Sequence, residues 1–316
     1  MNNENQQAID ALKQIAMAGI QEQRSSRRWG IFFKLATFLL FLLLILVIIS
    51  SAFSKNVKLT SAKEYTAVVD INGIILQGAS ASADNIIPAL QDAFKDEKAK
   101  GIILRCNSPG GSPVQSSYVY DEIRRLKALH KDKKVIAVAA DLCASGGYFI
   151  ISAADEIYAN KSSLVGSIGV RMKGFGVVEV MKKIGIESRE LTAGEHKAIM
   201  DPFSPRKPEE EAFVKKLLAT THKHFIDAVK VGRGDRLKDD PDIFSGLFWT
   251  GEGAKELGLV DGFGSDAYVA REIIKAPVMI NFSPKKGLFE KLSKRVSTSV
   301  KNWLLESESH SYPLLY

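Results

Sequence analysis

An uncharged apolar run near the N-terminus constrains the fold of this chain more than any other feature. Residues Leu35 to Phe53 contain no charged side chain and consist mainly of Leu, Ile, Val and Phe. As a helix rising about 1.5 Å per residue, the run spans roughly 28 Å, close to the ~30 Å core of a bilayer. A cleaved signal peptide ending at Ser50-Ser51-Ala52 is the alternative. Because the run exceeds the usual apolar region of about 7–15 residues, we favour an uncleaved transmembrane anchor.

Charges beside this run predict its orientation and the domain organisation. The flanking basic residues are Arg24, Arg27, Arg28 and Lys34 before it, and Lys55 and Lys58 after it. The excess before the run predicts a cytoplasmic N-terminus and export of everything after residue 54. The expected segments are a cytoplasmic segment 1–34, an anchor 35–53, a linker 54–63, an α/β domain 64–282 and a basic amphipathic tail 283–316, which could lie on a membrane surface or pack in an oligomer.

Composition excludes several classes of protein. The chain is 46% hydrophobic and 25% charged, as in globular proteins, so neither disorder nor a polytopic membrane protein is expected. The net charge is +7, but no basic run interleaved with aromatic residues predicts nucleic-acid binding. His222 and His224 lack the spacing of metal ligands, so no metal or other cofactor is expected.

The only two cysteines, Cys106 and Cys143, each lie at the end of an expected strand. They could therefore be neighbours, and a bridge between them is possible. An exported domain with two cysteines is not a disulfide scaffold. We favour the interpretation that both are buried, inert thiols.

Strands and helices alternate through the exported part of the chain. Expected strands are 66–71, 101–106, 135–140, 156–160, 167–170 and 186–191, and expected helices are 84–98, 114–130, 146–154, 177–184, 208–231, 251–257 and 265–275. This alternation predicts an α/β domain with parallel strand pairing.

A serine between a strand and a Gly-Gly helix start is the strongest chemical signal. Ser145 follows the apolar run 135–140 and precedes Gly146-Gly147. A serine held at such a turn can project its hydroxyl into a cleft beside backbone N–H groups, as a nucleophile requires. The alternative is an ordinary helix N-cap, because serine is a favoured cap.

The loop Asn107–Pro113 contains Gly110 and Gly111 and follows the neighbouring strand. Parallel strand ends meet at one edge of a sheet, so the N–H of Gly110 or Gly111 could join that of Gly146 in an oxyanion hole. An ordinary strand-to-helix turn is the alternative.

A serine nucleophile also needs a base, and the candidates are His196 and Lys197. A lysine serves only when neutral, which burial in an apolar site can achieve.

Four motifs follow one another along the chain: Asn107-Ser-Pro-Gly-Gly, Ala-Ser145-Gly-Gly-Tyr, Gly166-Ser167-Ile-Gly-Val and Gly194-Glu-His-Lys197. In this order they resemble the signal peptide peptidase A family of serine proteases in its short form. The resemblance covers about residues 65–275. It implies a Clp protease/crotonase-like domain of repeated β-β-α units and a membrane-anchored enzyme of the bacterial plasma membrane, with its catalytic domain on the extracytoplasmic side. It also implies that remnant signal peptides are the substrates.

The same resemblance implies the residue roles. Ser145 is the expected nucleophile, Lys197 the general base, Ser167 the serine that orients this lysine, and Gly146 with Gly110 or Gly111 the oxyanion donors. The resemblance implies a homo-oligomer in which serine and lysine come from different subunits. The alternatives are a crotonase-type acyl-CoA enzyme and a membrane quality-control scaffold.

Overall fold

The computed structural model describes residue 17, residues 27–46 and residues 63–284, and the chain divides into two units, Met1–Ser61 and Ala62–Tyr316. The first unit contains the helix Arg27–Leu46, which is long and apolar enough to cross a membrane. This helix begins before the predicted anchor start at Leu35. Residues 47–53 of the predicted anchor, the linker up to residue 62 and the tail from residue 285 lie outside the described residues.

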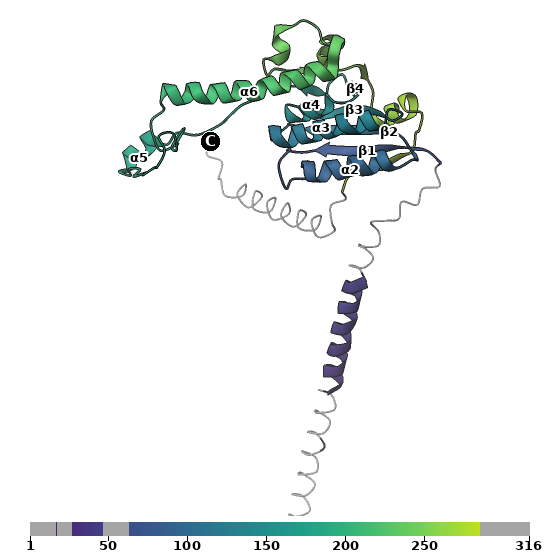
Figure 1. The fold of residues 1–316 in the computed structure, drawn as a ribbon. Coiled ribbons are helices and arrows are strands. Elements are labelled where there is room, and N and C mark those ends of the chain that lie inside the picture. Colours follow the sequence, from purple (N-terminus) through teal and green to yellow (C-terminus); the bar gives the residue numbers. More distant parts are fainter. Residues whose placement is uncertain (1–16, 18–26, 47–62, 285–316) are drawn as a thin grey trace, which may run out of the picture. The chain divides into compact units, whose positions relative to one another are not determined.

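The second unit is built on a mainly parallel sheet (Figure 1). Its strands are β1 Tyr65–Asn72, β2 Ala99–Ser108, β3 Lys134–Ala144, β4 Glu156–Ala159, β5 Leu164–Gly166, β6 Phe248–Thr250, β7 Gly262–Phe263 and β8 Met279–Asn281. The hydrogen-bonded order is β6-β5-β3-β2-β1-β8, and β4 pairs with β3 and β7. Every pairing is parallel except the antiparallel pair β5–β6. The α/β class predicted from the sequence is confirmed.

Helices follow the strands as the alternating pattern predicts. They are α2 Ala83–Lys95, α3 Pro113–Leu129, α4 Gly146–Ile151, α5 Val178–Ile184, α6 Pro208–Arg233, α7 Gly251–Glu256 and α8 Asp266–Tyr268, with the short helices η1 Gly234–Arg236, η2 Pro241–Phe244 and η3 Val269–Ile273. The apolar faces of α2, α3, α4 and α6 pack with one face of the sheet into the larger core.

Alternate residues of the central strands supply a second, smaller core on the other face of the sheet. Val68, Ile103 and Ile136 pack there against Val269 and other residues around η3. Their neighbours along each strand point into the larger core instead. This alternation is the expected period of two for strands that are covered on both faces.

Two predicted strands are absent from the structure. Residues 167–170 follow β5 as an irregular segment, because the backbone turns at Gly166 and Ser167, both at positive φ. Residues 186–191 are all exposed and form no strand. The sequence pattern was misleading there because strand-like residues form a strand only beside a pairing partner.

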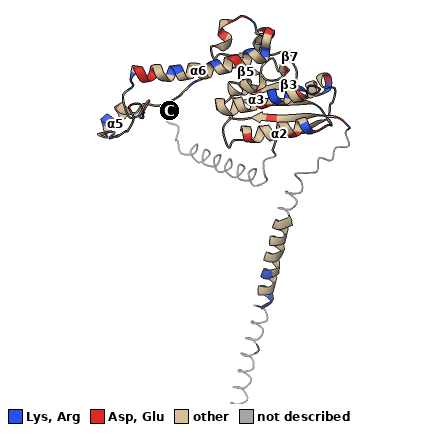
Figure 2. Ribbon diagram, in the orientation of Figure 1, with Lys and Arg blue, Asp and Glu red and all other residues tan. Residues whose placement is uncertain are grey.

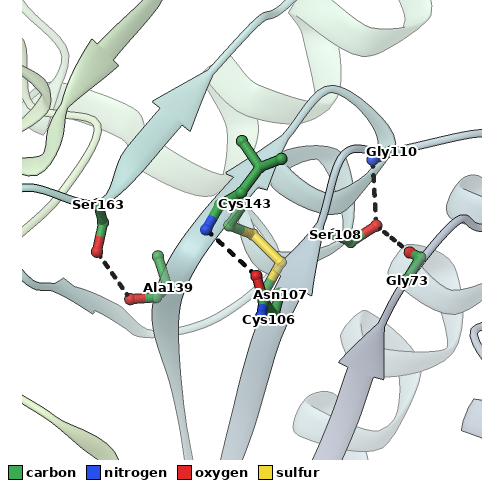
Figure 3. The surroundings of a disulfide bond; sticks show 9 residues. Gly73, Cys106, Asn107, Ser108, Gly110, Ala139, Cys143 and Ser163 are labelled. Carbon is green, nitrogen blue, oxygen red and sulfur yellow. Dashed lines mark hydrogen bonds between the residues drawn. A yellow bond between two sulfur atoms is a disulfide. The ribbon is translucent and has the colours of Figure 1, made fainter. Parts of the chain in front are cut away.

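The prediction of two free thiols is also wrong, since Cys106 and Cys143 form a disulfide with their Cα atoms 5.6 Å apart (Figure 3). Cys106 pairs with Ala139 in the β2–β3 ladder, whereas Ser108 pairs with Cys143. An irregularity between Cys106 and Ser108 shifts the register and brings Cys143 to Cys106. The alternation of strands and helices does not encode such a shift.

Candidate active site

Ser145 occupies a sharp turn between β3 and α4. Its backbone angles, φ 52° and ψ −125°, are ones that a residue with a side chain rarely adopts. Although it stands at the N-cap position, its side chain makes no capping hydrogen bond. The helix-cap alternative therefore does not explain this serine. Strained backbone of this kind is typical of nucleophiles at strand-to-helix turns.

The glycine loop after β2 packs directly against this turn. A Cβ atom added to Gly110 would lie 2.7 Å from both the Ser145 Cβ and the Gly146 nitrogen. A Cβ atom added to Gly146 would lie 2.5 Å from the Ser116 Oγ and 3.3 Å from the Gly111 nitrogen. Side chains at Gly110 and Gly146 would thus force the two segments apart. The structure brings Ser145, Gly110, Gly111 and Gly146 together, as the sequence analysis expected.

The two candidate oxyanion donors of the loop differ in their hydrogen bonds. The Gly110 N–H donates to the Ser108 Oγ over 3.1 Å (Figure 3). The Gly111 N–H has no acceptor within the part of the chain that the structure describes. Of the two, Gly111 is therefore the one with an N–H available to a ligand.

Ser167 lies on the same cavity as Ser145, in a turn held by backbone hydrogen bonds. The Ser145 N–H donates to the Gly166 carbonyl over 2.8 Å, and the Ser167 N–H donates to the Leu247 carbonyl over 2.7 Å. Ser167 itself has φ 50°. The β3–β5 pairing therefore fixes the distance between the two serine turns, and the β5–β6 pairing holds the Ser167 turn from its other side.

A cavity of about 690 Å³ opens at these turns. Its lining includes Ser145, Ser167 and all three candidate oxyanion glycines, together with the apolar side chains of Ile74, Phe149, Val170 and Phe225. The rings of Phe149 and Phe225 lie 4.9 Å apart, so α4 and α6 form one apolar wall. A cavity of this size with apolar walls and a few polar groups suits a peptide side chain and the bond beside it.

Lys197 does not line this cavity in the single chain. It lies in an exposed turn, and the Lys197 N–H donates to the Gly194 carbonyl over 3.1 Å. The alternative base, His196, is also exposed. Neither candidate is brought to Ser145 by the fold of the single chain, so the source of the base stays a prediction.

Ser108 is a residue to which the sequence analysis gave no role. It is fully buried, and its hydroxyl contacts both the loop before α3 and the turn after β1. Its place within the motif Asn107-Ser-Pro-Gly-Gly indicated that Ser108 lies near the candidate oxyanion loop. The sequence pattern does not reveal which groups its hydroxyl would bind. Among the described residues, no three His, Cys, Asp or Glu side chains gather as a metal site.

Comparison with known proteins decides the family. The model of peptidase family S49 matches residues 127–276. A relative in Methanocaldococcus jannaschii, provisionally named a protease, is 35% identical over 210 residues, which cover 64% of this chain and 67% of that one. This chain belongs to peptidase family S49. Membership implies a fold like that of Clp protease, in agreement with the helix-covered parallel sheet.

Two further relatives are much longer than this chain. The Na(+)/H(+) antiporter NhaA of Brucella melitensis is 44% identical over 227 residues, covering 70% of this chain and 31% of that protein. The chloroplastic serine protease SPPA of Arabidopsis thaliana is 30% identical over 252 residues, covering 77% of this chain and 36% of that protein. The matched stretch thus spans about a third of the length of each.

Proposed function

We propose that this chain is a serine endopeptidase in which Ser145 is the nucleophile. The observation that carries the proposal is the strained, uncapped Ser145 turn, packed against the Gly110–Gly111 loop on an apolar cavity. Among the described residues, the Ser145 side chain makes no capping hydrogen bond that would offset the strain of its backbone. Membership of family S49 and the name of the Arabidopsis thaliana relative support the same chemistry.

The general base in this proposal is Lys197 of a neighbouring subunit. No residue between Gly169 and Phe213 is buried in the single chain, and Lys197 lies in that stretch. Large apolar side chains are exposed there, including Phe175, Ile184 and Leu191. Such a surface is expected to pack against another protein surface, and a second copy is the partner that would complete the site. Packing would remove Lys197 from water and favour its neutral form.

The reaction then follows from these positions. The Ser145 Oγ attacks the peptide carbonyl while the neutral Lys197 amine takes its proton. The carbonyl oxygen becomes an oxyanion that accepts hydrogen bonds from the N–H groups of Gly146 and Gly111. The protonated lysine gives its proton to the leaving amine, which leaves an acyl-enzyme. Water, activated by the same lysine, releases the acid, and the Ser167 hydroxyl orients the lysine throughout.

The proposed substrates are remnant signal peptides in the bacterial plasma membrane. The helix Arg27–Leu46 would anchor the chain there, with the N-terminus in the cytoplasm and the catalytic domain outside. Phe149, Phe225 and Ile74 give the cavity the apolar walls that a signal-peptide segment would need. An anchored enzyme would meet such segments where they remain after secretion.

A serine-reactive fluorophosphonate probe tests the nucleophile on the full chain. We expect the wild-type protein to be labelled, Ser145→Ala to be unlabelled, and Lys197→Ala to be labelled at least a hundredfold more slowly, because general-base catalysis contributes about 10²–10⁴-fold. His196→Ala is the matched control and should be labelled at the wild-type rate. Undiminished labelling of Ser145→Ala would remove the proposed nucleophile.

A further inference from the structure

The turn after β1 and the loop after β2 are joined by a continuous set of hydrogen bonds (Figure 3). The Gly73 N–H donates to the Asn107 carbonyl over 2.9 Å, and the Ser108 hydroxyl donates to the Gly73 carbonyl over 2.6 Å. The Ser108 Oγ also accepts from the Gly110 N–H. Ser108 is thus bonded to both segments at once and is fully buried between them.

The hydrogen bonds continue beyond Ser108 to the candidate oxyanion donor. The Ile75 N–H donates to the Gly110 carbonyl over 3.0 Å, and the Ser112 N–H donates to the Ile75 carbonyl over 2.7 Å. This is a parallel bridge between Ile75 and Gly111. In such a bridge the N–H and carbonyl of the middle residue, here Gly111, point away from the partner strand. On that other side lies Gly146, beside Ser145.

We propose that Ser108 is a positioning residue that selects Gly111 as the oxyanion donor. The Ser108 hydroxyl accepts a hydrogen bond from the Gly110 N–H and so directs that N–H away from the substrate. The same hydroxyl donates to the Gly73 carbonyl and so holds the loop in the register at which Gly111 faces Ser145. Ser108 contacts neither the substrate nor the reacting atoms in this account. The inference rests on the proposed serine peptidase function and deepens it.

A second serine offers a closely matched control. Ser163 is 2% exposed and also bonds two backbone groups: its Oγ donates to the Ala139 carbonyl over 3.2 Å and accepts from the Asn160 N–H over 3.0 Å. Figure 3 shows it on the far side of β3 from Ser108. Ser108→Ala and Ser163→Ala therefore remove the same number of hydrogen bonds from equally buried sites, but only the first touches the glycine loop.

The test measures kcat and KM on a fluorogenic peptide, and inhibition by a peptide aldehyde, whose adduct with Ser145 carries an oxyanion. We expect Ser108→Ala to lower kcat and weaken aldehyde binding by roughly tenfold to a hundredfold, less than the 10²–10³-fold cost of losing a donor outright, with KM little changed. Ser163→Ala should stay within about twofold of wild type. Equal losses in both variants, or none in Ser108→Ala, would overturn the proposal.

Amide hydrogen exchange on the full-length Ser145→Ala protein, resolved to single residues, tests the loop without depending on activity or on Ser108→Ala folding. Gly110 should exchange slowly and Gly111 rapidly, and the reverse order would overturn the inference. Absence of fluorophosphonate labelling of the wild-type protein would instead reject the proposed function. The two failures are therefore distinguishable.

Discussion

The stretch Tyr65–Ile168 and the stretch Gly169–Phe213 differ in almost every physical respect. The first contains the central strands, part of both cores and the turns of the candidate site residues Ser145 and Ser167. The second has no buried residue and contains the short helix α5 and the start of α6. Figure 1 shows α5 and the first half of α6 lying away from the sheet. Figure 2 shows both charge signs along α5 and α6.

This difference separates two parts of the proposed site. The single chain brings together Ser145, Ser167 and the oxyanion glycines, but it does not bring Lys197 to them. Burial in the sheet supports the strain at Ser145 and Ser167, because neighbouring backbone hydrogen bonds over-determine both turns. The stretch Gly169–Phe213 leaves Leu191 99% exposed, and none of its apolar side chains is fully buried in the single chain. One region is buried within the chain itself, and the other is the surface that our proposal pairs with a second copy.

The largest effect on stability is expected at the ion pair between Arg233 and Asp261. This pair lies outside the stretch Tyr65–Ile168 but is bonded to it, because the Asp261 carboxylate accepts from the Ile157 N–H. Arg233 is 1% exposed and donates two hydrogen bonds of 2.8 Å to the Asp261 carboxylate. Asp261→Asn would leave a buried cation unpaired, so we expect a loss of about 3–5 kcal/mol in the free energy of unfolding, measured by urea denaturation. Asp227→Asn, at the exposed pair with Lys223, is the control and should change it by less than about 1 kcal/mol.

The same ion pair predicts acid sensitivity. Burial disfavours ionisation of Asp261, but hydrogen bonds and charge from Arg233 outweigh it, and its pKa is lowered. A lowered carboxyl pKa adds stability that is fully present above the unfolded value of about 3.9 and is lost as the pH falls through the folded value. Wild-type stability should therefore decline below about pH 4 more steeply than that of Asp261→Asn. Parallel acid-unfolding curves would contradict this.

Loss of the disulfide between Cys106 and Cys143 should have a somewhat smaller effect. The bond joins residues 37 positions apart, and closing a loop of that length is worth about 2–4 kcal/mol. It also joins the strand before Ser145 to the strand before the Gly110–Gly111 loop. Cys106→Ala with Cys143→Ala should lower the melting temperature, whereas a reductant should have no further effect on that double variant. An unchanged melting temperature would exclude the bridge from the folded protein.

The smallest effect on stability is expected in the stretch Gly169–Phe213. Leu191→Asp removes no buried contact in the single chain, so the unfolding free energy of the sheet domain should change by less than about 0.5 kcal/mol. Peptidase activity should nevertheless fall at least tenfold, because the proposed contact between subunits, which would bring Lys197 to Ser145, would be weakened. Sedimentation should show smaller particles. If the Leu191→Asp variant kept both the activity and the particle size of the wild type, a packing role for Leu191 would be contradicted.

Local patterns predicted the first region well and the second poorly. Apolar runs indicated β1, β2 and β3, and the Ser145-Gly-Gly motif indicated a turn that the structure has at that place. The disulfide was missed because it depends on a register shift between Cys106 and Ser108. Residues 186–191 have a strand-like sequence, but the single chain offers them no pairing strand. Lys197 was singled out by resemblance, and the structure leaves it in an exposed turn that does not line the cavity at Ser145.

Mixing two inactive variants tests the shared site most directly. Ser145→Ala and Lys197→Ala full-length proteins, each inactive alone, would be dissociated, combined and reassembled in detergent before peptidase activity is measured. A site built from two chains predicts that activity returns to roughly a quarter of the wild-type level, because about that fraction of random pairings joins an intact serine to an intact lysine. Activity that stays at the level of the separate variants, in particles shown to contain both, would contradict the account.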